Sequence, residues 1–145
     1  MSTGRICSRV MATAWPTETV RVVAQRMAEN DVGTLVVLEP DGASRAVGIV
    51  TDRDIAVRCV ARGLDPTKTR VSTIMTAQVQ SIDQEVPIED ALSRMATAGT
   101  RRLVVTGEGD AAVGILSLDD VLDLCTQEAA SIGRLLEKQK PHIPV

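Results

Sequence analysis

A short pattern occurs twice in this chain of 145 residues: a glycine, two aliphatic residues, a hydroxyl residue, two variable positions and an aspartate. The copies read GIVTDRD at 48–54 and GILSLDD at 114–120. Internal repetition indicates two copies of one structural unit, which restricts the possible folds more than composition does. Sliding the sequence by 68 residues aligns Arg26–Ala28 with Arg94–Ala96 and Leu35–Val37 with Leu103–Val105. After a two-residue shortening in the second copy, the offset becomes 66 residues and Gly48 aligns with Gly114.

The order of predicted elements is the same in the two copies. A short strand, near Met11–Ala14 or Val79–Ile82, leads into an amphipathic helix. Two aliphatic strands follow, joined by a turn rich in glycine and aspartate, and a second helix begins at the motif. The first helices are predicted over about Thr19–Asn30 and about Pro87–Ala98, and the second helices begin at Thr51 and Ser117.

The predicted fold is of the α+β class, with two β-α-β-β-α repeats packed as a pseudo-twofold module and an extended C-terminal helix. A half of about 65 residues buries little apolar surface by itself, so we expect the two sheets to pack against each other. We expect the first repeat at 1–63, a linker at 64–72, the second repeat at 73–126 and a C-terminal helix extension and tail at 127–145.

The last helix is predicted to extend from Ser117 to about Gln139, because only one glycine interrupts it before Pro141. A roughly heptad spacing relates Cys125, Ala129, Ile132 and Leu136. We expect this stripe to pack onto the module itself or onto a second copy of the chain, rather than onto a foreign partner.

Composition argues against several classes of function. The chain has one Trp, no Tyr or Phe and a net charge of −3. Proteins that bind nucleic acids use basic grooves and aromatic rings, so we expect no such binding. Three separated cysteines fit reduced thiols in the cytoplasm better than a disulfide framework. We expect no signal peptide and no membrane segment, because no apolar run approaches the roughly 20 residues that span a bilayer.

Catalysis is not expected. The only histidine, His142, lies in a proline-flanked tail, so no Ser–His or Cys–His pair is evident. No metal-ligand spacing is evident either, and the sequence requires no metal. Asp119 and Asp120 leave a helix start in different directions, which is poor geometry for a paired acid and base.

The hydroxyl–aspartate pairs Thr51/Asp54 and Ser117/Asp120 have two interpretations. A hydroxyl residue followed three positions later by an acid forms a capping box, which any helix can use. However, capping boxes prefer the longer Glu, and here a strand feeds a helix N-terminus, whose free N–H groups favour an anion. A short carboxylate there can accept hydrogen bonds from the vicinal hydroxyls of ribose. Close approach of a ligand to the backbone is expected at the glycines that open the motifs, Gly48 and Gly114.

The duplicated unit and its Gly–aliphatic–aliphatic–[Thr/Ser]-x-x-Asp junction resemble the CBS domain, named after cystathionine β-synthase. The resemblance covers about Ile6–Leu124 as one tandem pair, or Bateman module. The stretch VGIVTDRDIAVRCVARGLDP is similar to stand-alone bacterial members. The resemblance implies clefts that bind an adenosine nucleotide as a regulatory ligand: AMP, ADP or ATP and, less commonly, S-adenosylmethionine or NAD. It also implies a homodimer formed through helical faces, with a protein target that the sequence does not identify.

Carried over by position, the family's ribose-binding aspartates correspond to Asp54 and Asp120. The hydroxyl residues Thr51 and Ser117 are then expected near ribose or phosphate. The resemblance also implies that the base lies against the segments before the first strands, which are Val10, Met11 and Ala12 in one copy and Gln78, Val79 and Gln80 in the other.

Basic residues distinguish the two expected sites. Arg53 precedes the motif aspartate in the first copy, whereas Asp119 stands there in the second. Because an extra carboxylate repels phosphates, we expect the site of Thr51 and Asp54 to be the stronger anion site. Arg101 and Arg102 are further phosphate candidates, since the planar guanidinium fork suits phosphate oxygens.

Two functions remain open at this point. The main hypothesis is a regulatory adenosine-nucleotide-binding protein, whose ligand changes its conformation or its association. The alternative is a structural or interaction scaffold that dimerises with empty or vestigial clefts. Stabilisation by nucleotide distinguishes them, since a ligand that binds only the folded state raises its stability.

Overall fold

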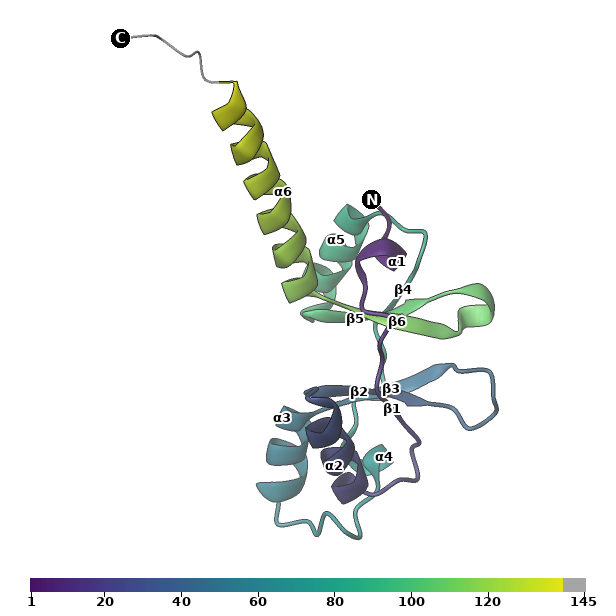
Figure 1. Ribbon diagram of the computed structural model, residues 1–145. Helices are drawn as coiled ribbons and strands as arrows, with labels where there is room; N and C mark the ends of the chain where they lie inside the picture. Colours follow the sequence, from purple (N-terminus) through teal and green to yellow (C-terminus); the bar gives the residue numbers. More distant parts are fainter. Residues whose placement is uncertain (140–145) are drawn as a thin grey trace.

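Two units, each with a three-stranded sheet, are stacked in the computed structural model, which describes residues 1–139 (Figure 1). The middle strand of each sheet pairs in parallel with the first strand and antiparallel with the last. Both units follow the predicted β-α-β-β-α order, which confirms the α+β fold class. The first unit contains β1 (Thr13–Ala14), α2 (Val20–Asn30), β2 (Thr34–Leu38), β3 (Ala46–Thr51), α3 (Asp52–Asp54) and the π-helix η1 (Ile55–Val60). The second contains β4 (Ser81–Asp83), α5 (Ile88–Ala98), β5 (Arg102–Thr106), the 3₁₀ helix η2 (Glu108–Asp110), β6 (Ala112–Ser117) and α6 (Leu118–Lys138).

Helices α2 and α5 lie where the sequence predicts them, because apolar periodicity and end residues agree there. The Thr19 hydroxyl accepts a hydrogen bond from the Val22 N–H at 3.4 Å, which satisfies one free amide at the start of α2. The α5 helix ends at Gly99, whose φ of 62° is a left-handed conformation that favours glycine. Buried against the sheets are Val20, Val23 and Met27 of α2 and Ala91 and Met95 of α5.

The two sheets face each other across an apolar core of their own. The middle strands β2 and β5 are therefore covered on both faces, by helices on one side and by the other sheet on the other. This explains why their sequences are apolar at consecutive positions rather than alternating. The predicted pseudo-twofold packing is confirmed by the buried residues between the sheets, which are Val36, Leu38, Val104 and Ala112.

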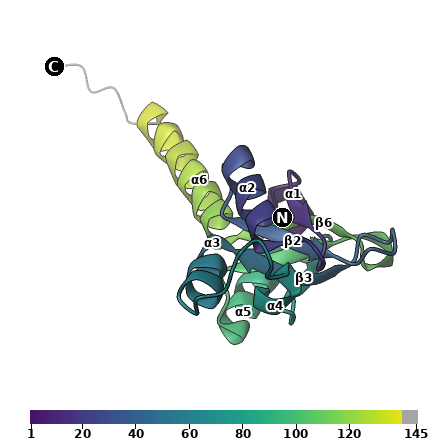
Figure 2. The same cartoon turned by 90° about the horizontal axis from the view of Figure 1, so that it is seen from below.

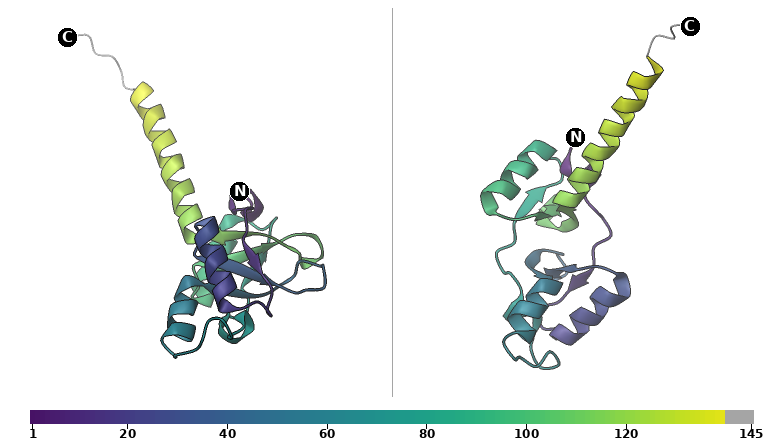
Figure 3. Two further views of the ribbon diagram at one scale, coloured as in Figure 1. Left: turned by 60° about the horizontal axis from the view of Figure 1, so that its bottom comes forward. Right: turned by 90° about the vertical axis from the view of Figure 1, so that its left-hand side faces the viewer.

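Each unit is completed by a short helix from elsewhere in the chain. The N-terminal helix α1 (Thr3–Ile6) packs against β4, β6 and α6 of the second unit. The helix α4 (Val71–Ile74), which follows the first unit in the sequence, packs back onto β3 and η1 of that unit. The chain consequently crosses between the units twice (Figure 3, right). The β2–β3 and β5–β6 hairpins extend from the same side of both units (Figure 2) and are joined by a bond of 2.9 Å from Ala112 N–H to the Ser44 carbonyl.

Helix α6 projects away from the two units, as Figure 1 shows in yellow-green. Val121 is buried under the module, but every residue from Cys125 to Gln139 is exposed. The helix ends at Lys138, close to the predicted end. The tail from residue 140 onward, with His142, lies outside the described residues. No helix within 1–139 has the length and apolar character needed to cross a membrane.

Candidate functional site

Both hydroxyl–aspartate pairs form capping boxes. The Thr51 hydroxyl accepts from the Asp54 N–H at 3.2 Å, and Asp54 Oδ2 accepts from the Thr51 N–H at 2.9 Å. Ser117 and Asp120 repeat this arrangement at 3.2 and 2.8 Å. The cap interpretation is therefore correct, but it does not exclude a binding role, because the cap uses only one of the two oxygens of each carboxylate.

The first motif opens into a cavity of about 570 Å³ between the units, which we call the first cleft. Asp54 lies at its edge with a side chain only 14% exposed. The first unit and the second unit contribute opposite walls, so neither repeat alone contains the cleft. The lining from the first unit is Ile49, Thr51, Arg53 and Asp54, and the lining from the second half is Thr76, Gln78, Gln80, Ala98, Gly99, Thr100 and Arg102.

The two walls are joined directly beside the motif. Arg58 on η1 lies 3.5 Å from Asp54 Oδ1 through its Nε atom. Its Nη1 donates to the Ile74 carbonyl at 2.9 Å and to the Thr76 hydroxyl at 3.2 Å. Arg58 therefore holds both the motif aspartate and the segment that leads to Gln78. Comparison of the repeats does not single out Arg58, because the second repeat has Leu124 at the equivalent position.

The second motif opens into a smaller cavity of about 220 Å³, which we call the second cleft. It has the same construction with the halves exchanged, since Ser117 and Asp120 line it together with the N-terminal segment and the residues that connect α2 to β2. Its wall is mostly apolar or neutral, with Asp120 as the only charged lining residue. The lining is Ser8, Val10, Met11, Ala12, Val32, Gly33, Thr34, Ile115, Ser117 and Asp120.

The clefts differ in charge. Arg53 and Arg102 line the first cleft. By sequence position, the second repeat replaces Arg53 with Asp119 and the first repeat replaces Arg102 with Thr34. The two walls of the first cleft thus carry one arginine each, whereas the second cleft has neither. This asymmetry favours an anion in the first cleft.

Not every predicted residue lies in a cleft. Arg101 lies outside the first cleft and instead approaches Asp119, with 3.5 Å between Nη2 and Oδ1. Val79 packs between the two sheets, while its neighbours Gln78 and Gln80 line the first cleft. Thr76 and Thr100 were not predicted to line a cleft. The repeat offset pairs Thr76 with Ser8, so the symmetry could have identified that position.

Gly48 and Gly114 lie against protein atoms of the other half of the chain. A Cβ atom at Gly48 would lie 2.5 Å from Met75 Sδ, and one at Gly114 would lie 2.6 Å from the Ser8 carbonyl oxygen. The space beside each glycine is filled by the chain segment from the other half. These glycines therefore allow the two halves to interlock, and a close approach of a ligand to their backbone stays a prediction.

Cys7 is a buried thiol packed in the core of the second unit. Burial raises the pKa of the Cys7 thiol above its ordinary value, against the opposing effect of Arg9. Within residues 1–139, no cluster of three His, Cys, Asp or Glu residues is placed to hold a metal ion. The polar groups of the clefts can accept, donate and neutralise charge, which is the chemistry of a binding site.

Comparison with known proteins gives consistent matches. The family model of the CBS domain matches residues 4–60 and 71–126. The CBS domain-containing protein YhcV of Bacillus subtilis is 36% identical over 134 residues, which cover 91% of this chain and 92% of YhcV. The CBS domain protein PAE2072 from Pyrobaculum aerophilum, solved in complex with AMP, has a TM-score of 0.75 and 29% identity over 87% of this chain and 99% of that one. Hypoxic Response Protein I, solved with two coordinated zinc ions, has a TM-score of 0.75 and 28% identity over 85% of this chain and 98% of that one.

Proposed function

The chain belongs to the CBS domain family, and from that membership we propose that it is a regulatory protein that binds AMP, ADP or ATP in the first cleft. The observation that carries the proposal is the composition of this cleft. A carboxylate, a hydroxyl and two arginines from both halves line one cavity of about 570 Å³. Ligand sites for small molecules have volumes of about 300–1,000 Å³. The similar protein PAE2072, which was solved with AMP, supports the same ligand class.

Each part of a nucleotide has a partner in the first cleft. Asp54 Oδ1 is not used by the capping box and can accept hydrogen bonds from the ribose hydroxyls. Arg53 and Arg102, on opposite walls, are suited to phosphate oxygens. The base is then expected to lie against the wall formed by Thr76, Gln78 and Gln80. The side-chain amides of the two glutamines can form hydrogen bonds with the edge of a purine.

The second cleft is proposed as the weaker site. It has the ribose-type pair Ser117 and Asp120 but no arginine, and its volume is about 220 Å³. A phosphate placed there meets the negative charge of Asp120 without a compensating cation in the lining. We therefore assign one strong nucleotide site to each chain.

The regulatory mechanism follows from the division of the first cleft between the halves. A ligand that contacts both walls is bound more tightly when the walls are correctly placed, so it shifts the population toward that arrangement. A partner protein, or a second copy of the chain, that reads this arrangement then responds to nucleotide concentration. No chemical step is required of the protein, so we propose a sensor and not an enzyme.

The alternative, a scaffold with vestigial clefts, predicts a different response to ligand. Thermal unfolding with AMP, ADP and ATP separates the two, with GMP and inorganic phosphate as controls. A ligand at about 100 times its dissociation constant stabilises the folded state by about 2.7 kcal/mol, which raises the unfolding temperature measurably. Stabilisation by adenosine nucleotides beyond that by phosphate supports the sensor. Equal unfolding temperatures with and without every nucleotide support the scaffold.

A further inference from the structure

Helix α6 carries an apolar stripe that is not covered by any other part of residues 1–139. Leu122, Ile132 and Leu136 are 53%, 57% and 60% exposed. Together with Cys125 and Ala129 they alternate at steps of three and four residues, which keeps them on one helix face. This spacing is that of the seam between two helices in a coiled coil.

A second apolar surface lies at the base of this helix. A hollow of about 290 Å³ is bounded by α5, by the turn that follows it and by the first residue of α6. We call it the α6 root hollow. Leu92 of α5 is 36% exposed at this hollow. Leu118 continues the stripe, since it lies four residues before Leu122. The hollow is lined by Leu92, Met95, Ala96, Gly99, Thr100 and Leu118, with Arg101 at its rim.

We propose that α6 pairs in antiparallel orientation with α6 of a second copy of this chain, and that Leu136 of each copy seats in the α6 root hollow of the other. The stripe and the hollow lie on one rigid helix, 18 residues or about 27 Å apart at 1.5 Å per residue. In one antiparallel register every residue of the stripe faces another residue of the stripe on the second helix. Its layers pair Leu118 with Leu136, Leu122 with Ile132 and Cys125 with Ala129, each formed twice by symmetry.

The side chains in this register are complementary in size. The small residues Cys125 and Ala129 meet at the centre, so the helices can approach to about 8 Å. The larger leucines and isoleucine then meet on either side of the centre. At the ends, Leu136 enters a hollow that no residue of its own copy fills within the described chain.

Charge also favours the antiparallel orientation. The first two turns of α6 carry Asp119, Asp120 and Asp123, and the last two carry Arg134 and Lys138 against Glu137. Antiparallel pairing places the acidic end of one helix beside the net basic end of the other and opposes the helix dipoles. Parallel pairing would bring the acidic ends together and leave both hollows unoccupied.

Sedimentation equilibrium without nucleotide tests the pairing independently of the proposed function. We expect the native chain to be a dimer at micromolar concentration. Leu136→Asp should raise the dimer dissociation constant by at least tenfold, while Gln127→Asp, on the opposite face of α6, should leave it unchanged. Circular dichroism checks that both variants keep their helix. A native monomer, or a Leu136→Asp variant that dimerises normally, would overturn the proposal.

Disulfide trapping tests the orientation. In a Cys125→Ser background, one preparation carries Leu122→Cys and another carries Ile132→Cys. Residues with the same number are ten positions apart in the antiparallel register, about 15 Å, whereas a disulfide needs Cα atoms within about 7 Å. After mixing and mild oxidation, we expect a cross-linked dimer only when both preparations are present. Cross-linking within either preparation alone would indicate parallel pairing and overturn the proposal.

Discussion

Ile49 and Thr76 exchange two backbone hydrogen bonds, of 3.0 and 2.8 Å, across the junction between the two halves of the chain. Ile49 lies on β3 two residues before Thr51, so this contact ties the first motif to the segment that opens the second repeat. Ser8 and Ile115 make the equivalent exchange at 2.9 and 3.0 Å. Each cleft is therefore built across a junction, and a ligand bound in one contacts both halves.

The glycines at these junctions should differ in their tolerance of a methyl group. At Gly114 the added Cβ would meet a backbone carbonyl at 2.6 Å, which can move only if the N-terminal segment moves. At Gly48 it would meet the Met75 thioether at 2.5 Å, and a flexible side chain can turn away. We expect Gly114→Ala to lower the free energy of unfolding by about 2–3 kcal/mol and Gly48→Ala by about 1 kcal/mol. Urea denaturation measures both, and an equal or reversed order would contradict the interlocking role.

Arg102 should contribute more to nucleotide binding than its neighbour Arg101 does. Arg102 lines the first cleft, whereas Arg101 lies outside it beside Asp119. We expect Arg102→Gln to weaken ATP binding by at least tenfold, since one charge-assisted contact contributes about 1.5–3 kcal/mol. The adjacent Arg101→Gln, with the same change in charge, should bind as the native protein does. Equal losses in the two variants would indicate a general effect of charge rather than a phosphate contact.

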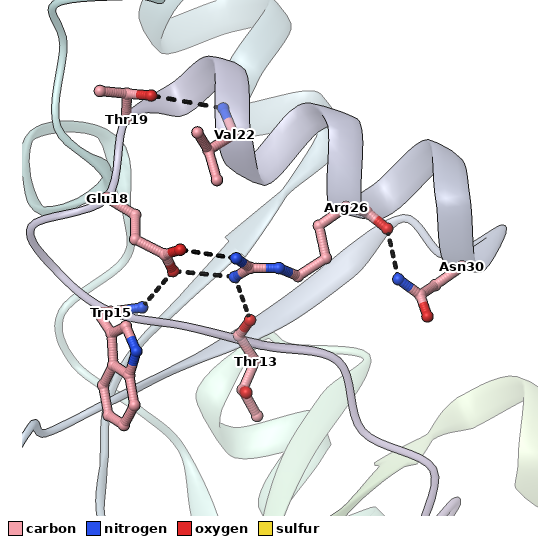
Figure 4. A network of polar contacts seen from close by, with 7 residues as sticks. All are labelled: Thr13, Trp15, Glu18, Thr19, Val22, Arg26 and Asn30. Atoms are coloured by element: carbon pink, nitrogen blue, oxygen red, sulfur yellow. Dashed lines mark hydrogen bonds and ion pairs between the residues drawn. The ribbon is translucent and has the colours of Figure 1, made fainter.

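An ion pair on the first unit gives a pH dependence of stability. Arg26 donates to both carboxylate oxygens of Glu18 at 2.6 and 2.9 Å, and to the Thr13 carbonyl at 2.7 Å (Figure 4). The Trp15 N–H donates to the same carboxylate at 2.8 Å. The hydrogen bonds from Arg26, more than any other contact, lower the pKa of Glu18 below 4.5.

Because the pKa is lower in the folded state, the stabilisation is present at pH values above the unfolded-state pKa and is lost as the pH falls through the folded pKa. We expect Glu18→Gln to cost about 1 kcal/mol of unfolding free energy at neutral pH, and this difference to shrink in acid. Denaturation across the pH range measures it. Glu85→Gln, on the exposed turn before α5, serves as control. A Glu18→Gln difference that is constant with pH would contradict this assignment.

Nucleotide and self-association should be coupled if both proposals hold. The turn of Gly99 and Thr100 lines the first cleft on one side and the α6 root hollow on the other. A nucleotide that orders this turn also orders the hollow, so the second copy pays less conformational entropy on docking. We expect saturating AMP to lower the dimer dissociation constant by about fivefold, a typical size for coupled sites. An unchanged constant, measured while AMP is bound, would show that the two sites are independent.

The local elements were predictable because several signals agree at each of them. The α2 helix has apolar residues at helical spacing, a threonine cap and a defined end, and β2 is an uninterrupted aliphatic run. Because the repeats align at a nearly constant offset, a helix or strand predicted in one half also predicts its equivalent in the other half. In contrast, the sequence does not predict that α4 packs onto the first unit and α1 onto the second. Both helices are short and both precede a repeat, so nothing in their sequences distinguishes the two arrangements.

The candidate site was predictable in its residue types but not in its assembly. Thr51 and Asp54 follow from spacing, whereas their position opposite Gln78 and Arg102 depends on how the halves exchange segments. The role of Gly48 could not be predicted from the sequence for the same reason. A missing Cβ indicates a close approach, but the sequence does not say whether a ligand or Met75 makes it. Arg58 has no counterpart in the second repeat, so symmetry could not point to it.

Isothermal titration of AMP into the native chain, Asp54→Ala and Asp120→Ala is the most direct test of nucleotide binding in the first cleft. Each variant removes the acid of one capping box, and Asp54→Ala also removes the ion pair with Arg58, so the stability of both variants is measured beside their affinity. We predict one tight site per chain, weakened at least tenfold by Asp54→Ala and retained by Asp120→Ala. Native affinity in Asp54→Ala, or no binding to the native protein, would contradict the account and leave Thr51 and Asp54 as a helix cap.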